Sequence, residues 1–106
     1  MNLNEWAREI HANAVDHGFW EPKMEFNTAL MLIVGEIAEA MEEHRAGNPM
    51  EWRNENGKPE GIAVEMIDAL IRILDWCGSE GLDVERLVSE KHAYNKSRPY
   101  KHGKLY

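Results

Sequence analysis

The sequence has little cysteine, no long apolar run and no segment with strand-like alternation. Its single cysteine, Cys77, excludes an internal disulfide and any zinc motif built on cysteine pairs. The longest apolar run covers residues 29–34, far too short to span a bilayer. A signal pattern is also missing, because polar residues interrupt the first ten positions. We therefore expect a cytoplasmic protein with no membrane segment.

Positive charge is scarce and unevenly placed. The chain has 12 Lys and Arg against 19 Asp and Glu, a formal net charge of −7. Residues 91–106 contain no acid and five basic residues: Lys91, Lys96, Arg98, Lys101 and Lys104. The remainder has 7 basic and 19 acidic residues, a charge of −12. The strongly acidic charge of residues 1–90 argues against a protein that binds nucleic acid. The basic segment 91–106 would suit the binding of a phosphate ester that is coordinated to a metal ion.

Apolar residues recur at helical spacing in four segments, which predicts a single all-α domain over residues 1–106. The expected helices cover about residues 4–17, 23–46, 60–79 and 84–96, with Asn2 or Asn4 capping the first and Asp83 the last. A polar loop spans 48–59, and a basic tail occupies about 97–106. We expect a four-helix-bundle-like arrangement. The predicted core face of the second helix is Phe26, Leu30, Ile33, Ile37 and Met41.

Two pairs of acids with three-residue spacing stand on the long central helices. They are Glu36 with Glu39, and Glu65 with Asp68. Residues three apart share a helix face, so neighbouring helices can bring four carboxylates together. Residues 24–44 contain no Lys or Arg to neutralise the first pair. Such a cluster repels itself unless a divalent cation is bound, and all-oxygen ligation favours Mg²⁺, with Mn²⁺ as the alternative.

Other interpretations of the same helices stay open. Acids at helical spacing also form solvated faces, so a non-enzymatic acidic helical module for interaction or oligomerisation is the alternative. We expect Arg72 to pair with Asp68 or Asp75 and Trp76 to pack in the core. The wide apolar arc of the third helix predicts a homodimer or homotetramer.

At these residues the sequence resembles the MazG-like, all-α nucleoside triphosphate pyrophosphohydrolases, in particular small stand-alone members from bacteria and phages. Glu36-x-x-Glu39, a loop, and Glu65-x-x-Asp68 match the metal motif of that family. The segments 11–20, 58–75 and 95–104 extend the resemblance over most of the chain. One departure is clear, since Leu32 and Ile33 stand where the family motif often has two further glutamates.

The resemblance implies Mg²⁺-dependent hydrolysis of a nucleoside triphosphate between its α and β phosphates, which gives a monophosphate and pyrophosphate. Glu36, Glu39, Glu65 and Asp68 would be the metal ligands and the catalytic residues, with Glu39 as the acceptor of the proton of water. Lys91 and Asn95, four residues apart on one helix face, would contact phosphate or sugar, and Arg98 follows them. Trp20 is our candidate for the base pocket. Base and sugar preference stay open.

Overall fold

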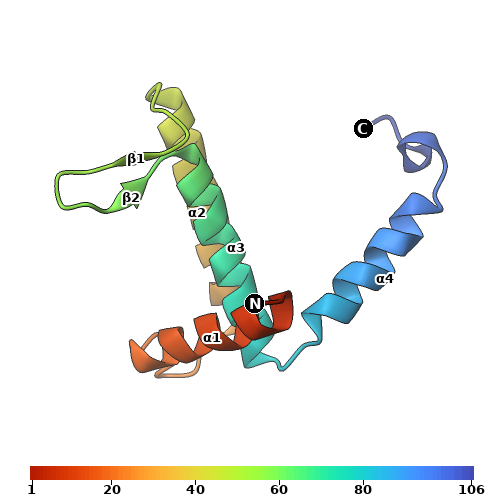
Figure 1. Cartoon of the computed structure of the whole chain (residues 1–106), viewed down its shortest axis with the longest axis horizontal. Helices are drawn as coiled ribbons and strands as arrows, with labels where there is room; N and C mark the ends of the chain where they lie inside the picture. Colours follow the sequence, from red (N-terminus) through yellow and green to blue (C-terminus); the bar gives the residue numbers. More distant parts are fainter.

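The computed structural model describes residues 1–106 as four α-helices and one small hairpin (Figure 1). In chain order the elements are α1 (Leu3–Asp16), α2 (Phe26–Arg45), β1 (Trp52–Arg53), β2 (Pro59–Glu60), α3 (Ile62–Ser79), α4 (Val84–Lys96) and a 3-10 turn (Tyr100–Gly103). The strands β1 and β2 are antiparallel and interrupt the loop predicted over 48–59. The prediction of an all-α chain is confirmed apart from this two-residue ladder.

The capping residues place the ends of α1 and α4 as predicted. The side chain of Asn2 accepts a hydrogen bond from the backbone of Glu5 at 2.8 Å, and the Glu5 side chain bonds back to the Asn2 backbone. Asp83 accepts from the backbone N–H of Arg86 at 3.1 Å. Each interaction satisfies a backbone donor that the first helical turn leaves free, so local sequence determines where the helix begins.

The two central helices begin later than predicted. Glu25 is extended and serves as the N-cap of α2, so that helix begins at Phe26 and not near Lys23. Glu60 pairs with Trp52 across the hairpin, and α3 therefore begins at Ile62. Before α3, the pairing with β1 holds the chain in extended conformation.

Helices α1, α2 and α3 pack together, with α2 beside α3 and α1 across the C-terminal end of α3 (Figure 1). Where α1 crosses α3 the backbones nearly touch, because a Cβ on Gly78 would lie 2.5 Å from the carbonyl oxygen of Ala7. The buried core lies at this end of the molecule and consists of Ala7, Leu74, Cys77 and Val84. Trp76 packs at its edge, as predicted.

Helix α4 leaves the core at Val84 and projects away from the other three helices (Figure 1). It contacts mainly α1. A single chain therefore has three packed helices and a projecting fourth, and no four-helix bundle closes within it. None of its helices has the length and apolar composition that a membrane crossing requires.

The predicted core face of α2 is wrong for the single chain. Ala29 and Ala40 are the buried residues of α2, Leu32 and Ile33 are half-buried, and the other large apolar side chains are exposed. Small residues let two helices approach closely, and this explains why α3 packs on the alanine face. Four of the five predicted residues, all except Ile33, belong to what we call the apolar side. Its members are each 40–53% exposed: Phe26, Leu30, Val34, Ile37 and Met41 on α2, and Met66, Leu70 and Ile73 on α3.

Candidate metal centre

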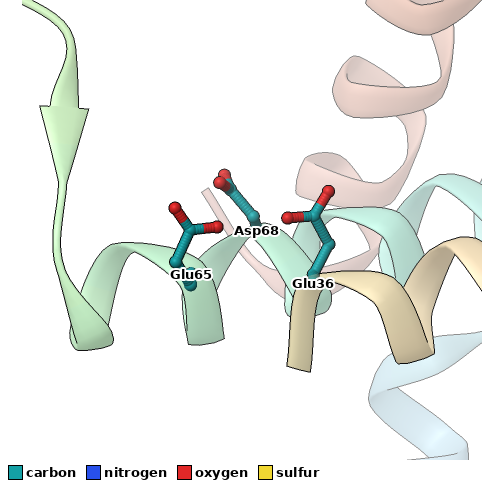
Figure 2. Close-up of side chains that lie close together, drawn as sticks. All are labelled: Glu36, Glu65 and Asp68. Carbon is teal, nitrogen blue, oxygen red and sulfur yellow. The ribbon is translucent and has the colours of Figure 1, made fainter. Parts of the chain in front are cut away.

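Three of the four predicted acids come together between α2 and α3. Carboxylate oxygens of Glu36, Glu65 and Asp68 all lie within 4.8 Å of one another. Figure 2 shows the three carboxylates on the same side of the two helices, with Glu36 projecting from α2 and the other two from α3. We call these three residues the acid cluster. The three-residue spacing and the side-by-side packing of the helices produce it, as the sequence predicts.

Glu65 is the most unusual member of the acid cluster. Its surface is only 9% exposed, and its Oε2 atom is buried with no hydrogen-bond partner. Desolvation, followed by the neighbouring Glu39 carboxylate and the charges of Asp68 and Glu36, raises the pKa of Glu65 to about 7. A buried carboxylate without a donor is costly, and a bound cation would remove that cost.

Glu39 lies beside the acid cluster and not within it. Its side chain is exposed and faces Glu65 from the next turn of α2. Together with Glu65 it lines a hollow that also involves Lys58 and Glu60 of the hairpin. Glu39, the fourth predicted acid, is thus adjacent to the other three, exposed to solvent and in no ion pair.

Positive charge near the acid cluster comes from Arg72 and Lys58. Desolvation and the charge of Glu36 raise the pKa of Asp68, while Arg72 and Lys58 act in the opposite direction. The Nε of Arg72 donates to Oε1 of Glu36 at 2.7 Å, which joins α3 to α2. The expected pairing of Arg72 with Asp68 or Asp75 is therefore wrong. Spacing along α3 could not reveal this partner, because Glu36 belongs to the other helix.

The loop before α3 is tied to α2 and fixes the first turn that carries Glu65. Glu43 accepts hydrogen bonds from the side chains of Asn48 at 2.6 Å and Trp52 at 3.3 Å. Gly61, with φ +120°, then lets the chain pass close to Met50, since a Cβ there would lie 2.3 Å from the Met50 carbonyl oxygen. Only glycine combines this φ with this close approach.

A hollow of about 290 Å³ adjoins the acid cluster. Its walls are half apolar and come from α1, the following turn, α2 and α3. The lining residues are Ile10, Asn13, Ala14, Phe19, Met24, Glu36, Asp68, Ile71, Arg72 and Asp75. The volume lies near the lower end of the range for small-molecule sites. Asn13 and Ile10 were not among the predicted site residues, because nothing in α1 alone shows which of its faces borders the acids.

Trp20 is placed next to this hollow but does not line it. Its indole N–H donates to both oxygens of Asp75, at 3.1 and 3.2 Å. His11 bonds to the same carboxylate at 2.8 Å, and the rings of His11 and Trp20 meet edge to face at 4.9 Å between centroids. Trp20 therefore anchors the segment after α1 on α3. Its neighbour Phe19 is the aromatic residue that faces the hollow.

Lys91, Asn95 and Arg98 do not reach the acid cluster of their own chain. The first two belong to α4, which projects away from α2 and α3 (Figure 1), and Arg98 follows that helix. No residue of α4 lines the hollow beside the acids. The Lys91 ammonium and the Arg98 guanidinium lie over the ring of Tyr94, at 5.0 and 5.5 Å from its centroid.

The donor set of the acid cluster is entirely carboxylate, which fits hard cations such as Mg²⁺ and Mn²⁺ and does not fit zinc. The adjoining hollow offers apolar walls for a flat ring and polar groups near the acids. No protein-family model matches the chain, and comparisons with curated proteins and with solved structures find no match either.

Proposed function

We propose that the chain is a Mg²⁺-dependent nucleoside triphosphate pyrophosphohydrolase, with Mn²⁺ as a possible substitute. The observation that carries this proposal is the buried Glu65 carboxylate, unpaired at Oε2 and surrounded by two further acids within 4.8 Å. A solvated acidic face would not bury an unpaired carboxylate, because the loss of hydration is uncompensated. The resemblance of Glu36-x-x-Glu39 and Glu65-x-x-Asp68 to the MazG-like motif points to the same activity.

Glu36, Glu65 and Asp68 would hold the cation, with Glu39 at its open side. A divalent cation at that place would neutralise the polyphosphate and make water a better nucleophile. Glu39 is exposed and free of ion pairs, so it can accept the proton that water loses during the attack. The anhydride bond between the α and β phosphates is broken, which leaves a monophosphate and pyrophosphate.

The hollow beside the acid cluster would take the nucleoside. Phe19 and Ile71 offer apolar surface to the base, and the Asn13 amide can donate and accept hydrogen bonds at its edge. The hydrogen bonds of Trp20 and His11 to Asp75 hold this lining residue of the hollow in place. We therefore assign stacking to Phe19 and an anchoring role to Trp20.

We also propose that two copies pair through the apolar side, as a dimer or as half of a tetramer. Only 9 of the 106 residues are buried in the single chain, and eleven large apolar residues on α2 and α3 are exposed, eight of them on the apolar side. Pairing these faces would form a bundle from α2 and α3 of both copies, in place of the bundle of the chain's own four helices that the sequence predicted. The exposed apolar side also suits the alternative function, a non-enzymatic interaction module.

Product analysis tests the proposed activity. Wild-type protein is incubated with canonical and damaged ribo- and deoxyribonucleoside triphosphates, with and without millimolar Mg²⁺, and the products are resolved. We expect monophosphate and pyrophosphate, with Mg²⁺ required. Glu36→Gln should lower the rate by about 10²–10³-fold, in the range found when charge stabilisation of a transition state is removed.

Glu9→Gln is the control, because Glu9 is exposed on α1 and lines neither of the hollows beside the acids. It should keep the wild-type rate. Release of a diphosphate and inorganic phosphate, or equal activity of Glu36→Gln and wild type, would contradict the proposal. If no triphosphate is hydrolysed and Mg²⁺ does not raise the thermal stability, the interaction module is the better description.

A further inference from the structure

The direction of α4 is fixed by hydrogen bonds to the N-terminus of α1. The Asn4 side chain accepts from the backbone of Val84 at 2.7 Å and of Glu85 at 3.2 Å, and donates to Asp83 at 2.9 Å. The backbone N–H of Leu3 donates to the Glu85 carboxylate at 2.6 Å. From this first turn α4 projects away from α2 and α3, and the C-terminus lies well clear of both helices (Figure 1).

The end of this projecting segment, residues 91–106, differs in charge from the rest of the chain, and we call it the basic arm. It has five Lys and Arg and no acid, a charge of +5. None of these five residues forms an ion pair, whereas four of the seven Lys and Arg in residues 1–90 do. All residues of the basic arm are exposed except Asn95 and Arg98, which are half-buried. Its positive charge is therefore open to an anion from outside the chain.

Distance weakens the repulsion that residues 1–90 would exert on an anion bound to the basic arm. At a rise of 1.5 Å per residue, Lys96 lies roughly 18 Å along α4 from Val84, which is buried in the core. The Debye length at physiological ionic strength is about 8 Å, less than half of that distance. The acidic charge of residues 1–90 thus argues against nucleic acid on those residues, and it does not argue against nucleic acid on the arm.

Tyrosine rings alternate with the cations along the basic arm. Tyr94, Tyr100 and Tyr106 follow one another at intervals of six residues, and each is more than half exposed. The Lys101 ammonium lies 5.8 Å from the centroid of the Tyr100 ring, and the Tyr94 ring has two cationic neighbours. Exposed aromatic rings with positive charge beside them suit a ligand in which planar bases alternate with phosphates.

Composition favours single-stranded nucleic acid over a membrane surface as this ligand. A segment that lies in a lipid interface needs an apolar face, and the basic arm has only Ala93, Pro99 and Leu105 besides its tyrosines. Single strands are favoured over a duplex, because unpaired bases expose their faces to aromatic side chains and paired bases are stacked on one another.

We propose that the basic arm binds single-stranded nucleic acid, with its Lys and Arg side chains on the phosphates and its tyrosine rings stacked on the bases. Binding tolerates different sequences, since every base has a face on which a ring can stack. This function is separate from hydrolysis at the acid cluster and needs no metal ion.

Fluorescence anisotropy with labelled oligo-dT and oligo-U, each of about 20 nucleotides, tests the proposal on the full chain. The titrations contain EDTA, so that no cation at the acid cluster can hold a phosphate. If all five cations contact phosphates, the logarithm of the affinity should fall with the logarithm of the salt concentration at a slope of about −3.5. The affinity should then drop about 100-fold between roughly 50 and 200 mM salt.

A triple variant, Lys96→Gln with Lys101→Gln and Lys104→Gln, removes three of these cations at exposed positions. Its slope should be shallower by about 2, which reduces the loss over the same salt range to about sevenfold. The matched control changes the net charge by the same amount at exposed positions that form no ion pair, and it should keep the wild-type slope: Arg8→Gln, Lys23→Gln and Arg53→Gln. Equal loss of binding in the two triple variants would show that net charge alone acts, and would overturn the proposal.

Substitution of the exposed rings separates stacking from charge. Tyr100→Leu and Tyr106→Leu should each weaken binding by about fivefold or more and leave the salt slope unchanged. A duplex of the same length should bind less tightly than the single strand. Wild-type affinity in both tyrosine variants, or a duplex that binds as tightly as the single strand, would contradict the stacking. If the wild type binds vesicles that contain phosphatidylserine and neither oligonucleotide, the arm is a membrane-surface segment and the proposal is wrong.

Discussion

The acid cluster and the apolar side belong to the same two helices and are incomplete in different ways. In the acid cluster, the buried Oε2 atom of Glu65 has no hydrogen-bond partner. On the apolar side, large apolar side chains are exposed to solvent. Ile37 follows Glu36 by one residue, about 100° around the axis, so the two surfaces face in different directions. The two surfaces differ in chemistry, so our two proposals assign them different partners, a cation for the acid cluster and a second copy for the apolar side.

A charge placed on the apolar side should have the largest effect. In Ile37→Lys the ammonium would have to be buried in the proposed contact between two copies, among the apolar side chains of that surface. We expect association to weaken by about 2–4 kcal/mol, the range for a central residue of an interface. Sedimentation or light scattering should show a shift to monomer.

Glu42→Lys is the matched control for that experiment. It introduces the same charge on the same helix at a position that is exposed and outside the apolar side. Its oligomeric state should equal that of the wild type. If both variants stay oligomeric, the apolar side is not the contact between copies.

Glu65→Gln should change the pH dependence of stability in the absence of divalent cations. The pKa of Glu65 is raised from 4.5 to about 7, so between these values the folded protein binds more protons than the unfolded chain. The stability of the wild type must then fall as the pH rises through this window, by about 3 kcal/mol in total. The variant cannot ionise at this position, and its stability should fall less.

Urea unfolding at several pH values between 4 and 8 measures this difference. Glu51→Gln, at an exposed position in the loop, serves as the control and should follow the wild type. Millimolar Mg²⁺ should restore the stability of the wild type near pH 7.5 and leave Glu65→Gln little changed. A wild-type stability that rises between pH 5 and 7 at the same rate as that of the variant would contradict the burial of an uncompensated acid.

Arg72→Gln should have the smallest effect and sharpens the description of the acid cluster. The Arg72–Glu36 pair is one-third exposed on the arginine side, so its loss should cost about 1 kcal/mol in cation-free protein. The thermal shift caused by Mg²⁺ should become larger, because the cation then relieves more repulsion. Arg45→Gln removes a pair that is about two-thirds exposed on both sides and should change neither quantity. A smaller Mg²⁺ shift in Arg72→Gln would mean that the arginine assists cation binding.

Features that depend on neighbouring residues in the sequence were predicted well. Asn2 and Asp83 cap α1 and α4 because each side chain bonds to a backbone N–H three residues away. The meeting of Glu36 with Glu65 and Asp68 also followed from helical spacing, once two adjacent helices were expected to pack.

Features that depend on distant residues could not be predicted. Helix α2 has apolar residues over a wide arc, and only the packed structure shows that α3 takes the side with Ala29 and Ala40. The partner of Arg72 lies on another helix, and that of Trp20 is 55 residues away. The direction of α4 depends on Asn4, about 80 residues earlier in the chain. Spacing within one element contains no information about such pairs.

Gly78 allows the close packing of α1 on α3, on which several of these distant contacts depend. Any side chain at this position would strike the backbone of Ala7 and the Cβ of His11, so α1 would have to move away from α3. Helix α1 contributes Ile10, Asn13 and Ala14 to the hollow beside the acid cluster, and its Asn4 side chain also binds the first turn of α4. The absence of a side chain at Gly78 therefore sets the distance of α1 from α3, and with it the position of one wall of the hollow and of the first turn of α4.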